Sequence, residues 1–241
     1  MRLLRALKLG GSVITDKRRP RTAREGLIRE LMERMAGWEG RLILVHGGGS
    51  FGHHEARRVG SLEEGVTRVR EAMHELVRVM ERAAVEAGVR VYALPPAVLL
   101  RSVNVVVDVL ERGCVPMLYG DVVPAGDGFR IMSGDEILER LAVLRVDRVG
   151  FGMDVDGVYP ERPGVGEPFK ELTPGEARAL AERLEGAAGV DVTGGIAEKL
   201  RRAARIAEVG VEVFLFDASD PDNVERFLRG ERVGTRVVRR D

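Results

Sequence analysis

The stretch that decides the fold is RLILVHGGGSFGHH at residues 41–54. Residues 42–45 form an apolar run, and a short run that ends near glycines is typical of a buried strand followed by a turn. A second junction of this kind lies at residues 3–12, where an apolar run ends at Gly10 and Gly11. Repetition of the pattern predicts buried, parallel strands that are each followed by a helix.

Outward from this stretch, short apolar runs alternate along the chain with longer segments of helical periodicity. We expect strands at 3–9, 41–45, 89–94, 115–119, 148–152, 211–216 and 236–238, and a hairpin made from 121–123 and 129–132. We expect helices at about 22–36, 61–87, 101–112, 133–145 and 194–209, with two more opening near 173 and 220. Strands separated by helices predict an α/β fold with a mostly parallel, open sheet sandwiched between helices.

Capping boxes mark the expected start of four of these helices. In each box a serine or threonine is followed three residues later by a glutamate, which satisfies two free N–H groups at once. The four capping residues are Thr22, Ser61, Ser133 and Thr173.

The composition excludes several classes of protein. The chain has 241 residues, of which 44% are hydrophobic and 32% charged, with a net charge of zero. These values argue against a disordered chain and against a dedicated nucleic-acid binder. No apolar run reaches the ~18 residues of a membrane span, no signal peptide is apparent, and a single cysteine excludes an intramolecular disulfide. We therefore expect a cytoplasmic protein without membrane or nucleic-acid partners.

The length favours a single domain over residues 1–241 with a weak internal boundary. We expect an N-terminal lobe of about 1–145 and a C-terminal lobe of about 146–241.

Most of the basic residues are arginine: the chain has 34 arginines and only four lysines. Scarce Asn, Gln and Cys beside many ion-pairing residues indicate a thermophile, and a GC-rich genome would favour arginine equally. Because an ammonium and a guanidinium are not interchangeable at a phosphate, the lysines mark candidate sites. Lys8 precedes the first glycine turn, Lys17 lies in the loop after it, and Lys199 lies one turn into the helix that opens at 194–195. We assign Lys170 to the surface.

The glycine-rich junctions suit anionic ligands, because parallel sheets bind ligands at the carboxyl ends of their strands and helix N-termini present free N–H groups. The glycines at 47–52 satisfy a dinucleotide pattern and nearly satisfy a Walker A motif, but His53 stands where the lysine belongs. A histidine there better suits a substrate that carries a phosphate. His54 follows directly, so which histidine binds is open, and a histidine that is exposed to solvent or acts as a structural cap is the simpler alternative.

Lysines at separate strand ends are what phosphoryl transfer requires, since fixed cations stabilise the charge of its transition state. Asp135 lies in the first turn of a helix, where it would hold Lys8 and Lys199 in place or merely favour the helix dipole. Asp154 begins a D-x-D-G stretch that lacks the later glutamate of a calcium loop. We interpret it as a turn that faces a nucleotide.

Together these motifs resemble the amino acid kinase superfamily, which includes acetylglutamate, carbamate and uridylate kinases, and they cover nearly the whole chain in the same order. Within it, residues 10–17, 49–53 and 120–121 are most similar to isopentenyl phosphate kinases of archaeal type. The resemblance implies ATP-dependent phosphorylation of isopentenyl phosphate to isopentenyl diphosphate, in an alternative mevalonate route to isoprenoids. It also implies Mg²⁺ carried on the ATP phosphates rather than on a protein site, and a homodimer.

The resemblance also implies roles for individual residues. The catalytic residues would be Lys8, Lys17, Asp135 and Lys199. The substrate phosphate would be held by Gly48, His53 and Gly134. The ATP side would be lined by Lys8, Gly10, Gly11, Ser12, Gly49, Asp154, Gly195 and Lys199.

The chain departs from the family pattern at two positions, and three alternative functions are open besides the one that the resemblance implies. His54 replaces an expected proline and Met153 a common threonine. The alternatives are a kinase of another small phosphate or phosphonate such as fosfomycin, a nucleotide-sensing module on the same fold, and a dinucleotide-dependent oxidoreductase. The last does not explain Lys8 and Lys199. An apolar stripe that includes Met73 and Val77 is either core or a wall for the apolar tail of the substrate.

Overall fold

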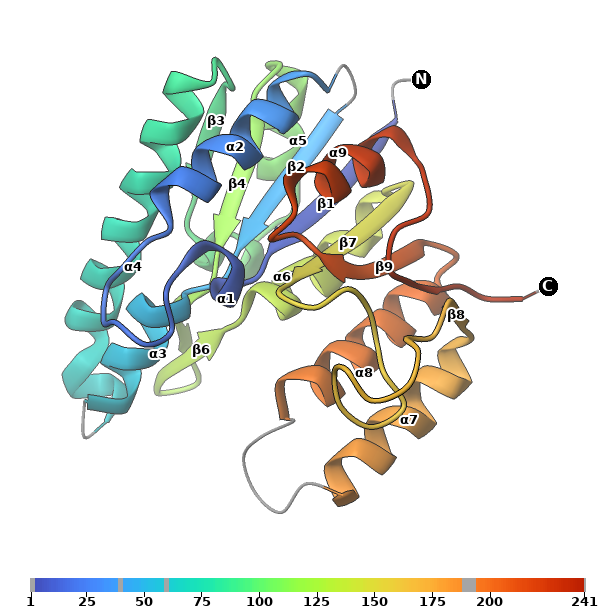
Figure 1. The fold of residues 1–241 in the computed structure, drawn as a ribbon. Coiled ribbons are helices and arrows are strands. Elements are labelled where there is room, and N and C mark those ends of the chain that lie inside the picture. The colour runs from blue at the N-terminus through green and yellow to red at the C-terminus, as the bar shows by residue number, and fades with distance from the viewer. Residues whose placement is uncertain (1–2, 39–40, 59–60, 188–193, 241) are drawn as a thin grey trace.

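A computed structural model gives the structure of the chain and describes residues 3–38, 41–58, 61–187 and 194–240. Helices cover both faces of one central sheet (Figure 1). Its strands are β1 (Leu4–Leu9), β2 (Arg41–His46), β3 (Val91–Leu94), β4 (Val115–Tyr119), β7 (Arg148–Met153), β8 (Glu171–Leu172), β9 (Glu212–Asp217) and β10 (Thr235–Val237). They lie in the order β3-β4-β2-β1-β7-β9-β10-β8. The pairs from β3 to β9 are parallel, and β10 runs antiparallel to β9. The mostly parallel, open sheet that the sequence predicts is confirmed.

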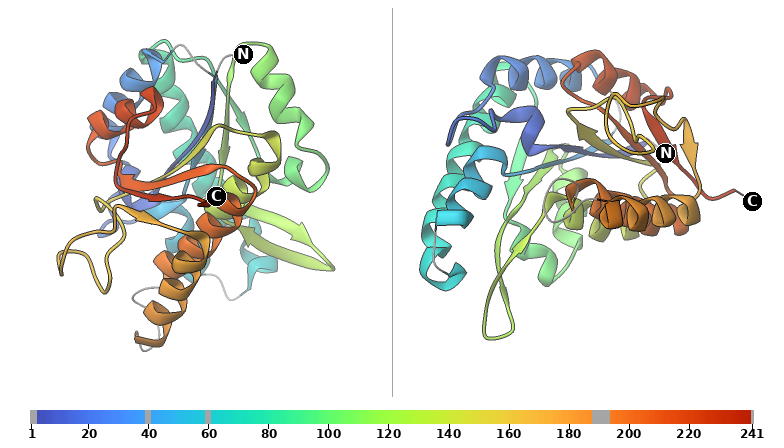
Figure 2. Two further views of the ribbon diagram at one scale, coloured as in Figure 1. Left: turned by 90° about the vertical axis from the view of Figure 1, so that its right-hand side faces the viewer. Right: turned by 60° about the horizontal axis from the view of Figure 1, so that its bottom comes forward.

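Alternation along the strands divides the core into two layers, because successive side chains of a strand point to opposite faces. Ala6 of β1 packs on the face covered by α5 (Asn104–Glu111), α6 (Gly134–Leu141), α7 (Pro174–Ala187) and α8 (Gly194–Glu208). Leu7 and Leu9 pack on the other face, covered by α1 (Gly11–Ile14), α2 (Glu25–Ala36), α3 (Gly49–Arg58), α4 (Leu62–Glu86) and α9 (Pro221–Arg229). Figure 2 shows both layers edge-on.

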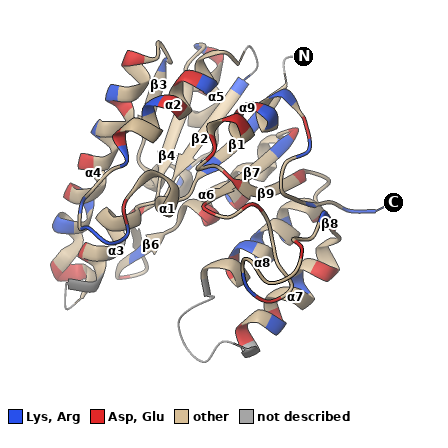
Figure 3. Ribbon diagram, viewed as in Figure 1, with Lys and Arg blue, Asp and Glu red and all other residues tan. Residues whose placement is uncertain are grey.

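Charged residues of both signs are interspersed over these helices in Figure 3, as the net charge of zero suggests. In the part of the chain that the structure describes, no helix is both long enough and apolar enough to cross a lipid bilayer.

Three of the four predicted capping residues are confirmed and one is wrong. The reciprocal bond of a capping box, from the N–H of the capping residue to the glutamate, is present at Thr173. The hydroxyls of Ser61, Ser133 and Thr173 each accept a hydrogen bond from the backbone N–H three residues on. Thr22 does not cap a helix, because its hydroxyl donates to the carbonyl of Pro20 at 2.9 Å. The helix therefore begins two residues later than a Thr22 cap implies, after Arg24, which makes no side-chain cap.

The remaining differences are one missed helix and several short elements. The missed helix is α3, which lies in the glycine-rich stretch where we expect no helix before residue 61. The helix expected at 101–112 is shorter, since α5 covers Asn104–Glu111, and a 3₁₀ turn, η1 (Pro96–Leu100), precedes it. A second turn, η2 (Ala142–Leu144), continues α6. The predicted hairpin is present as β5 (Asp121–Ala125) and β6 (Gly128–Met132), a separate two-stranded sheet. The short α1 and β8 lie outside all the predicted elements.

The strand order places the candidate site at β1. This strand pairs with β2 on one side and with β7 on the other. Strands from the first half of the chain extend the sheet beyond β2, and strands from the second half extend it beyond β7, so the order reverses at β1. Open α/β sheets bind ligands at such a reversal, outside the carboxyl ends of the strands.

Candidate active site

The first two glycine junctions lie against each other at the carboxyl ends of β1 and β2. A Cβ atom on Gly11 would come within 2.5 Å of the Cα atom of Gly49. Gly49 itself has a φ of +48°, and a Cβ there would lie 2.6 Å from the carbonyl oxygen of Gly11. Side chains are therefore excluded from both positions by the contact between the loops, independently of any ligand.

The second junction is helical rather than an open loop, since α3 begins at Gly49. Its first turn is tied to the β1 side by Ser50, whose N–H donates to the hydroxyl of Thr15 at 2.9 Å. The His53 side chain lies outside the described part of the structure. His54 is partly exposed, with Nδ1 3.6 Å from Oε1 of Glu55. The choice between the two histidines thus stays a prediction.

Two lysines and one aspartate meet at the centre of the site. Asp135 lies in the first turn of α6, two residues after the capping Ser133. One carboxylate oxygen accepts a hydrogen bond from the ammonium of Lys8 on β1. The other lies 3.0 Å from Nζ of Lys199, one turn into α8. The structure thus brings together three residues that are widely separated in the sequence, in the arrangement that the sequence suggested.

Burial controls the charges of this lysine–aspartate cluster. Burial lowers the pKa of the Lys8 ammonium to about 8, although Asp135 opposes the shift. Burial would raise the pKa of the Asp135 carboxyl, but the two ammonium groups outweigh it and hold that pKa at about 2. Near pH 7 the cluster therefore carries one net positive charge in a place that water barely reaches.

A second lysine–aspartate contact lies at the surface beside the first. Nζ of Lys17 lies 3.2 Å from Oδ2 of Asp154, and the Ser12 hydroxyl donates to Oδ1 at 2.9 Å. Burial opposes ionisation of Asp154, but the Ser12 hydroxyl and the Lys17 charge lower its pKa overall. The three residues come from α1, the loop after it and the end of β7. They therefore lie where the strand order reverses.

The remaining predicted residues fall around these two contacts. A Cβ on Gly134 would lie 3.1 Å from Cε of Lys8, and one on Gly10 would lie 2.8 Å from the carbonyl of Gly152. A Cβ on Gly48 would lie 2.9 Å from Sδ of Met73, whereas one on Gly195 would meet no atom within 4 Å. Gly195 is thus at an open rim. Residues 191–193 of the third junction lie outside the described residues.

Lys170 is exposed, as the sequence analysis assigned it. Met73 and Val77 are buried in the apolar core, so the stripe to which they belong is core. Whether it also contacts a substrate tail stays a prediction.

Sequence analysis missed Arg21, which holds the Lys17 loop to the helices beside it. Its guanidinium contacts Glu55 of α3 at 3.2 Å and Glu71 and Glu75 of α4 at 2.6 and 3.3 Å. Its φ of +46° is unusual for a residue with a side chain. No local pattern could reveal this role, because the partners lie 34, 50 and 54 residues further along the chain.

His46, the last residue of β2, has an environment that the sequence did not predict. It is fully buried, its ring stacks on Tyr119 at 5.7 Å, and Nδ1 lies 3.2 Å from the carbonyl oxygen of Gly47. Burial lowers its pKa to about 4. His46 is therefore neutral at pH 7 and contributes packing rather than charge behind the glycine junction.

The fold and the site together define a class: an α/β protein that presents touching glycine junctions and an anchored pair of lysines to an anionic ligand at the carboxyl edge of its sheet. The chain belongs to the Amino acid kinase family, whose pattern it matches over residues 4–217.

Several relatives are similar over almost their full length. An isopentenyl phosphate kinase of Methanothermobacter thermautotrophicus is 34% identical, with 96% of this chain and 98% of that protein covered. One from Thermoplasma acidophilum is 32% identical, with 97% and 99% covered. The crystal structure of the T. acidophilum isopentenyl phosphate kinase product complex superposes with a TM-score of 0.81 at 28% identity and covers 97% of this chain and 99% of that one.

Proposed function

We propose that this chain transfers the γ-phosphoryl group of Mg²⁺-bound ATP to isopentenyl phosphate, producing isopentenyl diphosphate and ADP. The observation that carries the proposal is the buried cluster of Lys8, Asp135 and Lys199 at the point where the strand order reverses. The similarity of the chain to isopentenyl phosphate kinases over 96–97% of its length supports the choice of acceptor.

Phosphoryl transfer to a phosphate monoester requires that the protein position the substrates and supply positive charge, but it does not require a general base. A phosphate monoester has a second pKa near ~6, so its attacking oxygen is already ionised at neutral pH. Lys8 and Lys199 stabilise the charge that spreads over the transferring phosphoryl oxygens, and Lys17 adds a third cation at the rim. Asp135 holds the two buried ammonium groups apart at fixed positions and takes no proton, since its pKa is about 2.

The two substrates approach from different sides of the cluster. The ATP side consists of residues from all three junctions and the end of β7, namely Gly10, Gly11, Ser12, Gly49, Asp154 and Gly195. The acceptor phosphate lies over Gly48, His53 and Gly134. We assign the phosphate-acceptor side to the lobe of residues 1–145 and the ATP side to the lobe of residues 146–241.

Mg²⁺ enters with ATP as part of the substrate, where it neutralises phosphate charge. We further propose that the protein is a homodimer. Two exposed hydrophobic residues, Tyr92 on the edge strand β3 and Val85 on α4, support this proposal. Light scattering during size-exclusion chromatography tests it. Location in the cytoplasm and origin in a thermophile also stay predictions.

Release of ADP tests the acceptor directly. The protein is given ATP and Mg²⁺ with isopentenyl phosphate, fosfomycin, aspartate, carbamate or UMP in separate reactions. We expect ADP release to be fastest with isopentenyl phosphate. A faster reaction with fosfomycin or another acceptor would overturn the choice of substrate, and ATP binding without ADP release from any acceptor would favour a nucleotide-sensing module.

A further inference from the structure

A second set of ion pairs lies directly behind the lysine–aspartate cluster and joins the same two helices. On α6, Glu139 follows Asp135 by four residues, and on α8, Arg202 follows Lys199 by three. Residues at these spacings lie one turn apart on the same face of a helix. The facing surfaces of α6 and α8 therefore carry acid and base in two successive layers, of which the function proposed above uses only the first.

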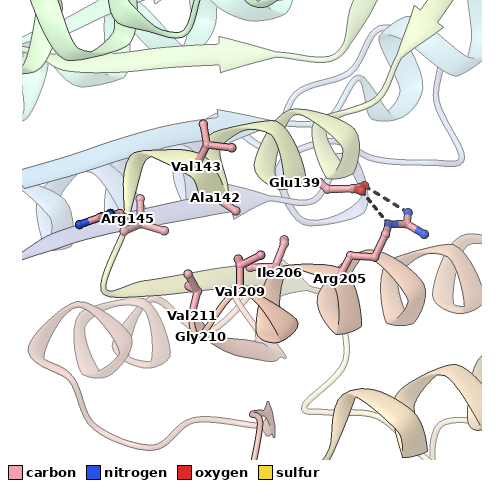
Figure 4. Close-up of a pocket in the computed structure, with 10 residues that line it drawn as sticks. Glu139, Ala142, Val143, Arg145, Arg205, Ile206, Val209, Gly210 and Val211 are labelled. Atoms are coloured by element: carbon pink, nitrogen blue, oxygen red, sulfur yellow. Dashed lines mark hydrogen bonds and ion pairs between the residues drawn. The ribbon is translucent and has the colours of Figure 1, made fainter.

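The second layer is tightly connected. Nη1 of Arg202 lies 2.6 Å from Oε2 of Glu139, and Nη2 lies 2.8 Å from Oε1 of Glu198, the residue before Lys199. Nε of Arg205 lies 2.6 Å from Oε1 of Glu139, a contact that Figure 4 shows at the wall of the pocket between α6 and α8. Arg202 is the more enclosed of the two arginines, with 16% of its side chain exposed against 43% for Arg205.

Two layers of ion pairs constrain the positions of α6 and α8 more than a single layer would. With the Asp135–Lys199 contact alone, α8 could still turn or slide about that point, since the lysine ammonium sits on a flexible stem of four carbons. The guanidinium of Arg202 bridges two carboxylates, one on α6 and one on α8. It therefore fixes the turn of α8 that carries Lys199 relative to the helix that carries Asp135.

We propose that Arg202, through Glu139 and Glu198, is a positioning residue for Lys199. It acts on phosphoryl transfer only by holding the Lys199 ammonium at the distance from Asp135 that the reaction needs. The inference rests on the proposed function, since it assumes that Lys199 serves a phosphoryl transfer.

Arg201 provides a matched control on the same helix. Its Nη1 lies 2.7 Å from Oε1 of Glu185 on α7, and it also contacts Glu198 at 3.6 Å. Arg201 thus ties α8 to α7 rather than to the helix of Asp135. Loss of Arg201 removes ion pairs of the same kind and leaves the contacts of Arg202 with Glu139 and Glu198 in place.

The first measurement compares kcat for single variants with whichever acceptor gives the fastest ADP release. A wrong acceptor therefore overturns the proposed function without affecting this test. We expect Arg202→Met to lower kcat about tenfold, Arg201→Met to stay within twofold of the unmodified protein, and Arg202→Lys to recover part of the loss. Unchanged kcat in Arg202→Met, or an equal loss in Arg201→Met, overturns the inference.

The second measurement is a double-mutant cycle with Lys199→Ala, which separates positioning from general stabilisation. If Arg202 acts through Lys199, adding Arg202→Met to Lys199→Ala changes kcat by less than twofold. A further tenfold loss in the double variant would mean that Arg202 supports the fold at large, and the inference would be wrong. Circular dichroism and thermal melting check folding, and if Arg202→Met fails to fold, Glu139→Gln takes its place in the same cycle with the same criteria.

Discussion

Two lysine–aspartate contacts lie at the carboxyl edge of the sheet, and they differ in their surroundings. In the buried one, the side chains of Lys8 and Asp135 are 7% and 12% exposed. In the surface one, the side chains of Lys17 and Asp154 are 64% and 42% exposed. Water and salt screen the surface contact but hardly reach the buried one. The same two residue types therefore make a rigid arrangement of charge in one place and an adjustable one in the other.

The comparison teaches where preorganisation can be expected. A cation stabilises a transition state most when it is already in place and needs no rearrangement during the reaction. The buried cluster meets that condition because Asp135 holds both ammonium groups. Lys17 meets it less well, since its partner is shared with Ser12 and open to solvent. The largest effects of substitution are thus expected at the buried cluster.

Lys199→Ala should show the largest effect on turnover. We expect kcat to fall by roughly 10²–10³, the usual loss when one preorganised charge is removed. Folding should change far less, because Asp135 keeps Lys8 as a partner. Steady-state kinetics and thermal melting measure the two effects, with Lys170→Ala, an exposed lysine, as the control. Equal kinetic constants in Lys199→Ala and the unmodified protein would reject the role.

The pH dependence of the reaction should report the buried cluster. Because burial lowers the pKa of Lys8 to about 8, its ammonium form decreases as the pH rises through 8. We expect kcat/KM for ATP, which reports the free enzyme, to fall about tenfold per pH unit above that value. Lys17→Ala should keep the same alkaline limb, since Lys17 lies outside the cluster. A flat profile up to pH 9.5 would contradict the assignment.

Lys17→Ala should have an effect of intermediate size. We expect kcat to fall about tenfold at most, less than for Lys199→Ala, because an exposed cation is screened and mobile. The loss should also shrink as salt is added, since salt already weakens the interaction in the unmodified protein. Kinetics at low and high ionic strength test both statements. A loss as large as that of Lys199→Ala would remove the distinction between the two contacts.

The histidine pair extends the comparison to α3. We expect His53→Ala to raise KM for the phosphate acceptor several-fold through loss of a charge-assisted hydrogen bond, and His54→Ala to raise it less. Titration of the acceptor at saturating ATP measures both values. If His54→Ala is the damaging change, the register taken from the family resemblance is displaced by one residue.

The smallest effect concerns the apolar side of the acceptor site. Sδ of Met73 lies within 2.9 Å of where a Cβ on Gly48 would stand, so this side chain backs the glycine junction. Shrinking Met73 or Val77 to alanine should admit longer prenyl phosphates and leave ATP affinity unchanged, with up to ~0.8 kcal/mol for each additional buried CH₂. Competition with dimethylallyl and geranyl phosphate measures the preference. If neither variant changes it, this face of α4 serves the core alone.

The sequence predicted what depends on local patterns. Apolar runs that end at glycines located the main strands, since burial on both faces demands continuous hydrophobicity. The glutamates after Ser61, Ser133 and Thr173 located three helix starts. The rarity of lysine among so many arginines singled out Lys8 and Lys199, which the structure places on one aspartate.

What escaped prediction depends on distant partners. Thr22 carries a capping pattern, but its hydroxyl turns to Pro20 within a tight loop. Arg21 and Arg202 look like any other arginines of the chain, and only the fold brings carboxylates of other helices to them. The antiparallel direction of β10 could not be predicted either, because the sequence of a three-residue strand does not indicate its direction in the sheet.

The contact between Gly11 and Gly49 limits how this protein can be redesigned. The junction after β1 is assigned to the nucleotide, and the junction after β2 also carries the acceptor residues Gly48 and His53. The two junctions meet backbone to backbone at Gly11 and Gly49. A side chain introduced on either loop at this point would displace the other, so selectivity for the two substrates cannot be altered independently there. Changes of acceptor are open instead to residues behind the loops, such as those of α4, where a side chain can shrink without moving the backbone that both substrates would touch.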